Sequence, residues 1–188
     1  YVSLNAWEAA TQQNLTTGNT ARVVCSSNLD AGGGTADTTA VVIDGWTTGT
    51  TTYIQIEANS NHGGKWNTGV YRLSVTNAVA FGPWEDFINV IGIQMEVVAP
   101  AANGRRIIDY GAVVAGSVQN YSKCLFRLHG STTYWQQGVY INDADGTINL
   151  RNCVIYGGPQ NTNNNDVSLF CNAATALNID NCTISGGY

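Results

Sequence analysis

The second half of the chain alternates apolar and polar residues with a period of two, which predicts β-strands. Ile148 and Leu150 point one way, whereas Asn149 between them points the other. Directly after Asn152 the apolar positions resume with Cys153 and Ile155, so Asn152 is one extra residue between two alternating segments. Asparagine tolerates the left-handed backbone conformation better than other non-glycine residues. The pattern therefore predicts a strand, a one-residue bend and a second strand.

This unit recurs at a fixed interval. Residues 147–158 align with residues 176–187 without a gap, and a looser copy covers residues 118–126. Each copy carries one cysteine, and these lie 29 residues apart: Cys124, Cys153 and Cys182. A period of this size is typical of a solenoid, because no single turn can bury its own apolar face.

Parallel stacking of the copies predicts columns of side chains. The expected inward columns are Gln119/Ile148/Leu177, Tyr121/Leu150/Ile179, Cys124/Cys153/Cys182 and Phe126/Ile155/Ile184. An outward column holds Asn120, Asn149 and Asn178, whose amides we expect to hydrogen-bond along the stack.

Earlier segments resemble wider copies. Residues 87–95 have the same form with Gly92 at the bend, and residues 53–57 predict one more turn before them. Residues 21–26 predict the first strand. Further strands, separated by loops of unequal length, are predicted at 70–75, 106–110, 139–142 and 167–171.

The first fifteen residues differ and predict a helix, with Ser3 as N-cap. Its apolar positions would cover strand edges at the open end of the stack: Leu4, Trp7 or Ala10, and Leu15. We therefore expect a capping helix within residues 1–18 and one β-helix domain over residues 19–188. The last turn has no predicted cap, so either more chain or a partner is expected there.

Composition narrows the function classes. Charged residues are 11% of the chain, against roughly 25% in typical soluble proteins. The net charge of −5 and the absence of a basic cluster argue against nucleic acid as a partner. No apolar run approaches the ~20 residues that span a membrane. No signal peptide is visible, although the chain opens at Tyr1 without Met, which is compatible with a missing leader.

The five cysteines are odd in number and form no CxxC pair. Three of them share one inward column, which predicts buried free thiols rather than a disulfide framework. Parallel side-chain vectors also suit a disulfide poorly. Free thiols favour folding in a reducing cytoplasm, and later release on a virus particle is compatible with them.

These repeats, with Asn152 and Asn181 at the short bends, resemble the right-handed parallel β-helix, or pectin-lyase-like, superfamily over nearly the whole chain. The opening segment 3–10 also looks like the helical cap of phage-encoded and metagenomic members. The resemblance implies an all-β, right-handed parallel β-helix with a short N-terminal capping α-helix. The superfamily includes polysaccharide lyases and hydrolases, phage tailspikes and capsid-attached proteins, so the fold alone does not choose a function.

A lyase of the pectate type would need calcium-binding acids beside an Arg or Lys base. The nearest candidates are Asp143 and Asp145 in an Asp-x-Asp-Gly sequence. No further acid follows at useful spacing, so a turn that uses Asp and Gly is the favoured interpretation. A hydrolase would need two or three converging carboxylates, whereas the Glu and Asp residues here are scattered over different turns. His62 and His129 have no metal-ligand spacing, and we expect no cofactor.

Four tryptophans fall in or beside loops: Trp46, Trp66, Trp84 and Trp135. Exposed aromatic rings stack on sugars or fill protein interfaces, but they also form small cores beneath loops, and the sequence leaves both interpretations open. The candidate binding residues are Tyr134, Trp135, Gln136, Trp66 and Trp84.

The sequence thus favours a non-catalytic β-helix on the exterior of a bacteriophage particle, such as a capsid decoration, head fibre or tail appendage. Its expected partners are other virion subunits or copies of itself in a homo-oligomer, together with surface glycans. The expected location is the virion surface or the extracellular space. The alternative is a polysaccharide lyase or hydrolase, or a carbohydrate-binding module.

Overall fold

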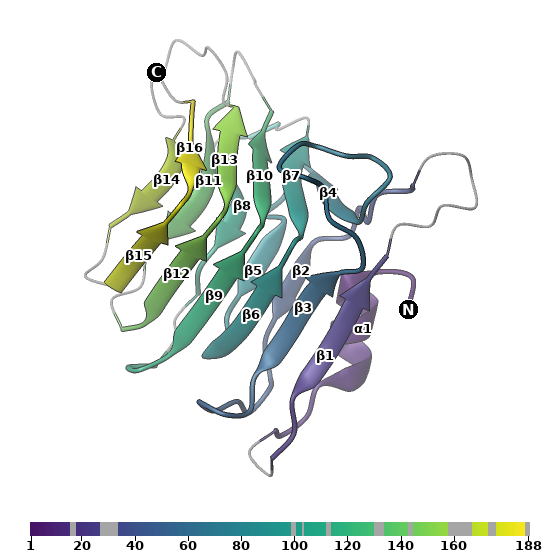
Figure 1. Cartoon of the computed structure of the whole chain (residues 1–188), viewed down its shortest axis with the longest axis vertical. Helices are drawn as coiled ribbons and strands as arrows, with labels where there is room; N and C mark the ends of the chain where they lie inside the picture. Colours follow the sequence, from purple (N-terminus) through teal and green to yellow (C-terminus); the bar gives the residue numbers. More distant parts are fainter. Residues whose placement is uncertain are drawn as a thin grey trace.

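The computed structural model describes residues 1–15, 18–26, 34–98, 101–102, 104–111, 114–129, 134–142, 145–157, 167–172 and 176–186. These residues form a parallel β-helix of about four turns with one short α-helix at its N-terminal end (Figure 1). Four successive turns each add one strand to each of three sheets, from β3–β5 to β12–β14, and all paired strands run parallel. The predicted fold class is confirmed.

The sheets are named here by the order in which the chain visits them. The first sheet comprises β1 (Ala21–Cys25), β3 (Ile54–Ala58), β6 (Phe87–Ile91), β9 (Val118–Ser122), β12 (Thr147–Arg151) and β15 (Ala176–Asp180). The second sheet comprises β4 (Arg72–Thr76), β7 (Gln94–Val98), β10 (Leu125–Leu128), β13 (Val154–Gly157) and β16 (Thr183–Ile184). The third sheet comprises β2 (Val41–Ile43), β5 (Phe81–Pro83), β8 (Arg105–Asp109), β11 (Gln136–Ile141) and β14 (Val167–Cys171).

One residue turns the chain from the first sheet into the second, as the sequence predicts. Asn152 and Asn181 have φ angles of 53° and 49°, and Gly92 has a φ of 69° at the equivalent position. Lys123 occupies the same bend with a φ of 56°. The bends stack through backbone hydrogen bonds, such as the one from Gly92 N–H to the Ser122 carbonyl (2.9 Å).

The predicted inward columns form the core. Strand register places Ile148 beside Gln119 and Leu177, and Ile155 beside Phe126 and Ile184. Side chains of the β9–β10 and β12–β13 turns are buried in every column. In the last described turn, Ile179 and Ile184 are 47% and 42% exposed, because β15 and β16 are the outermost described strands of their sheets.

The placement of one predicted strand and the existence of two others do not follow from the sequence pattern. The segment at 70–75 is a strand, β4, but it lies in the second sheet, whereas β8, β11 and β14 lie in the third. The cause is an insertion over residues 59–71, which delays entry into the second sheet in that turn. Strands β2 and β5 were both missed, and the Phe-Gly-Pro sequence of β5 lacks alternation and contains two residues that are unfavourable in strands.

The helix α1 (Leu4–Thr11) packs beside β2 at the N-terminal end (Figure 1). Ser3 caps it, since the Ser3 hydroxyl accepts a hydrogen bond from the Ala6 N–H (3.0 Å). Leu4, Trp7 and Leu15 are buried, and the Trp7 ring stacks on Trp46 with 5.5 Å between centroids. Trp7, not Ala10, is therefore the apolar residue that the helix turns toward the stack. Among the described residues, no helix has the length and apolar character needed to cross a membrane.

The stacked cysteines are free thiols, as predicted. Cys124 and Cys153 are buried, and Cys182 is partly exposed in the last described turn. The Cys153 N–H donates a hydrogen bond to Cys182 Sγ (3.3 Å), so neighbouring turns bring these residues into contact. Burial raises the pKa of the Cys124 thiol well above its usual value.

Candidate glycan-binding surface

The sequence-predicted stretch Tyr134-Trp135-Gln136 leads into β11 and packs against the turn before it. Gln136 is buried, and the two aromatic residues are half-buried. A Cβ atom on Gly104 would lie 3.1 Å from the Trp135 ring, and the Gly104 N–H donates a hydrogen bond to the Trp135 carbonyl (3.1 Å). The Trp135 ring therefore covers a glycine of the preceding turn.

Trp66 and Trp84 lie on other segments of the chain than Trp135 and have different neighbours. Trp66 belongs to the 59–71 insertion and lies beneath the Arg127 guanidinium, 3.9 Å from the ring centroid. Trp84 follows β5, is 45% exposed and packs against Gly111. The five predicted binding residues therefore come from three segments of the chain, each with its own contacts.

The calcium candidate falls only partly within the described residues. Asp143 lies outside them, and the Asp145 carbonyl accepts a backbone hydrogen bond from Gly116 of the preceding turn of the solenoid (3.2 Å). Among the described residues, no group of three or more His, Cys, Asp or Glu side chains is placed to hold a metal ion.

The 59–71 insertion is anchored to the outer face of the second sheet, beside β4 and β7 (Figure 1). The Gln94 amide, fully buried, accepts from the Asn67 N–H (2.7 Å) and donates to the Asn67 and Tyr71 carbonyls. His62 Nδ1 accepts from the Gly64 N–H, so its Nε2–H donates to the Lys123 carbonyl (2.7 Å). His62 thus fixes the insertion to the bend of a later turn.

Beneath this insertion lies a cluster that sequence reasoning missed. Glu96 accepts hydrogen bonds from Arg127 Nε (2.7 Å) and Ser74 Oγ (2.6 Å), and its Oε2 lies 2.5 Å from His129 Nε2. Burial favours the neutral acid, but the hydrogen bonds from His129, Ser74 and Arg127 outweigh it and lower the pKa of Glu96. The cluster thus joins side chains from three successive turns through one carboxylate.

A second buried acid, Glu85, has a raised pKa, whereas the pKa of Glu96 is lowered. Glu85 is 7% exposed and accepts a hydrogen bond from the Trp46 N–H (2.6 Å). Burial, with the nearby charges of Asp44 and Asp86, raises its pKa to about 7 despite that hydrogen bond. The Glu85 carbonyl also accepts from the buried Gln119 amide (2.7 Å), which explains how a glutamine occupies an inward column.

The outer face of the first sheet carries the predicted ladder of asparagines. Asn149 Nδ2 donates to Asn120 Oδ1 and Asn178 Nδ2 donates to Asn149 Oδ1, both at 2.8 Å. The ladder extends one turn further than the sequence predicted, because Asn120 Nδ2 donates to Asn89 Oδ1 (2.7 Å).

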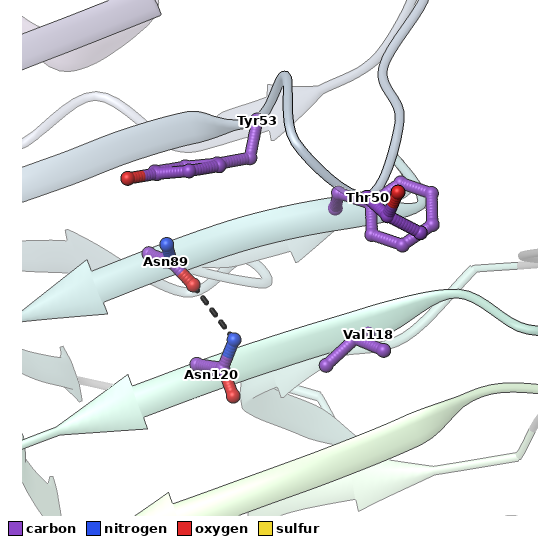
Figure 2. A pocket seen from close by; sticks show the side chains of 6 residues that line it. Thr50, Tyr53, Asn89, Val118 and Asn120 are labelled. Carbon is purple, nitrogen blue, oxygen red and sulfur yellow. Dashed lines mark hydrogen bonds between the residues drawn. The ribbon is translucent and has the colours of Figure 1, made fainter. Parts of the chain in front are cut away.

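At the Asn89 end of the ladder, the same face is hollowed into an open groove of about 220 Å³. Figure 2 shows Tyr53 beside the hydrogen-bonded pair of Asn89 and Asn120. The lining residues come from three successive turns and carry no formal charge: Thr50, Tyr53, Phe87, Asn89, Val118 and Asn120. Aromatic faces beside amide groups are the chemistry that binds neutral sugars.

Comparison with known proteins finds no matching family model, no matching curated protein and no matching solved structure. The parallel β-helix is thus established by the strand pairing of this chain, and membership of the pectin-lyase-like superfamily stays a prediction.

Proposed function

We propose that this protein is a non-catalytic structural β-helix on the exterior of a bacteriophage particle, such as a capsid decoration, head fibre or tail appendage, and that its outer faces adhere to glycans. Other virion subunits or further copies of the chain are the partners that this role requires. A reducing cytoplasm would be the place of folding, in keeping with the free thiols Cys124 and Cys153.

The observation that carries the proposal is that the carboxylates of Glu96 and Asp37 are held by hydrogen bonds from other parts of the fold. The Glu96 carboxylate is held by Arg127, Ser74 and His129, and Asp37 accepts hydrogen bonds from the Leu4 N–H (2.7 Å) and the Tyr71 hydroxyl (2.9 Å). These carboxylates connect separate turns or the cap. Glycoside hydrolysis instead needs two carboxyl groups that face a sugar across a gap.

The rod itself supports a structural role. Its core continues from turn to turn, and its outer faces present amide, hydroxyl and aromatic groups at regular intervals. Such a repeating surface suits adhesion, because weak contacts on adjacent turns add together when one long ligand spans them.

The proposal is tested by incubating the purified chain with acidic and neutral polysaccharides and following unsaturated products and new reducing ends. We expect neither product. Release of either one, abolished by the Glu96→Gln substitution, would favour the alternative of a lyase or hydrolase, for which the proximity of Glu96, Arg127 and His129 is the supporting observation. Mass spectrometry of gradient-purified phage particles tests the location, and the proposal requires the chain to band with intact particles.

A further inference from the structure

We propose that the groove on the first sheet is the site of glycan contact and that it binds one ring of a neutral saccharide. Tyr53 and Phe87 supply aromatic surface, and Asn89 supplies a directed hydrogen-bond donor. This inference rests on the proposed role in adhesion and specifies where that adhesion occurs and which class of sugar it selects.

The direction of the asparagine ladder identifies the donor. In every step of the ladder, the amide nitrogen donates toward the N-terminal end of the solenoid: from Asn178 to Asn149, from Asn149 to Asn120 and from Asn120 to Asn89. The chain of bonds stops at Asn89: the residue beside it in β3 is Gln55, whose amide nitrogen donates within its own strand to Glu57, and Asn89 and Gln55 share no side-chain hydrogen bond in the described part of the chain.

Asn89 Nδ2 is therefore the end of the ladder and donates to no acceptor within the described part of the chain. Figure 2 shows its nitrogen directed toward Tyr53 and its oxygen toward Asn120. Hydrogen bonds in a chain polarise one another, so the N–H groups at this end are stronger donors than those of an isolated amide. They face the groove, where a sugar hydroxyl or ring oxygen can accept from them.

The remaining lining selects a neutral sugar. A pyranose ring has an apolar C–H face that packs on aromatic rings and a rim of hydroxyl groups that pair with amides. An acidic sugar would require a cationic partner, which none of the lining residues Thr50, Tyr53, Phe87, Asn89, Val118 and Asn120 provides. The groove is smaller than the roughly 300–1,000 Å³ of pockets for drug-sized ligands, so it fits one ring of a longer glycan that continues along the sheet.

The test is a titration of the isotope-labelled full chain, followed by the backbone amide signals in NMR spectra. The probes are hexamers of glucose in α-1,4 and β-1,4 linkage, of mannose, of xylose and of N-acetylglucosamine, with a galacturonate hexamer as the acidic comparison. We expect a neutral hexamer to shift the signals of Tyr53, residues 87–89 and residues 118–120, with a Kd on the order of 1 mM.

Two variants and a matched control define the site. Asn89→Asp keeps the oxygen that accepts from Asn120 but removes the N–H donors, and Tyr53→Ala removes the ring while the Tyr53 carbonyl still accepts from the Ala21 N–H. Each should weaken binding about threefold to tenfold. Asn142→Asp is the control, because Asn142 accepts from Asn172 in the same way (2.9 Å) but lies after β11 in the third sheet. It should change the Kd less than about twofold.

Each other outcome overturns the inference. If the shifted signals map to a different face, such as the one that carries the stacked Tyr140 and Phe170 rings, the protein binds glycans there and not in the groove. Preference for the galacturonate hexamer would refute the selection of neutral sugars. If no hexamer shifts any signal at about 10 mM, the groove is not a sugar site, and the structural role is then judged by the particle experiment alone.

Discussion

The buried carboxyl group of Glu85 makes a specific pH dependence of stability testable. Its pKa is about 7 in the folded protein, against 4.5 when the group is unperturbed. The folded state therefore binds this proton more tightly than the unfolded chain does. The stabilising contribution of the neutral acid is complete below about pH 4.5 and is lost as the pH rises through 7.

The magnitude follows from the difference between the two pKa values. Each pKa unit corresponds to about 1.4 kcal/mol, so ionisation costs the folded state at most about 3 kcal/mol at pH 8. Water near this loop screens part of that cost, and we expect about 1–2 kcal/mol. Glu85→Gln keeps an oxygen that accepts from the Trp46 N–H but cannot ionise. The variant should be about as stable as the wild type at pH 5 and more stable at pH 8.

Urea unfolding followed by tryptophan fluorescence at both pH values measures this difference. Glu57→Gln is the control: the hydrogen bond from Arg22 lowers the pKa of Glu57, so its contribution is lost only as the pH falls below about 4.5. That variant should show the same difference from the wild type at pH 5 and at pH 8. If Glu85→Gln destabilises the protein equally at the two pH values, the Glu85 carboxyl is ionised in the folded state throughout and the reasoning is wrong.

Three further predictions concern the core, the bend and the cap. Cys153→Asp should lower the free energy of unfolding by about 4 kcal/mol or more, because it buries an unpaired charge; an unchanged melting temperature would contradict the inward column. Asn152→Ala should be about 1–2 kcal/mol less stable than Asn152→Gly in urea titrations, since both lose the amide and only alanine resists the left-handed conformation. Equal stabilities would show that the bend relaxes. Removal of residues 1–15 should expose strand edges and cause end-to-end association in light scattering, and a monodisperse truncated protein would refute the capping role.

The sequence predicts the C-terminal half of this fold well, because two gapless copies fix which residues stack. Aligning the copies is enough to pair Ile148 with Leu177 and Asn152 with Asn181, and both pairs are neighbours in the folded chain. In an ungapped repeat, strand register is identical to sequence alignment. The N-terminal half is harder, since the insertion at 59–71 breaks the period and the third strand of that turn, β5, lacks alternation.

The candidate sites were less predictable, because their residues come from different turns and share no sequence motif. Glu96, Arg127 and Ser74 share one outward column of the second sheet, but Glu96 is 22 residues from Ser74 and 31 from Arg127, and the three follow no common motif. The groove was missed because it joins Tyr53, which precedes a strand, to residues of two later turns. A signal did exist: Asn89 occupies the ladder position of residues 87–95, the segment that resembles a wider copy of the repeat.

The cysteine column offers a built-in reporter of local opening. Alkylating reagents react with thiolates, and burial both blocks access to Cys124 and disfavours its ionisation. Modification of the buried Cys124 or Cys153 in native buffer therefore requires the surrounding strands to separate first. Pulsed alkylation, read by mass spectrometry, would then compare how often the strands around each cysteine open. The comparison would show whether local unfolding of the solenoid starts at one end or in the middle.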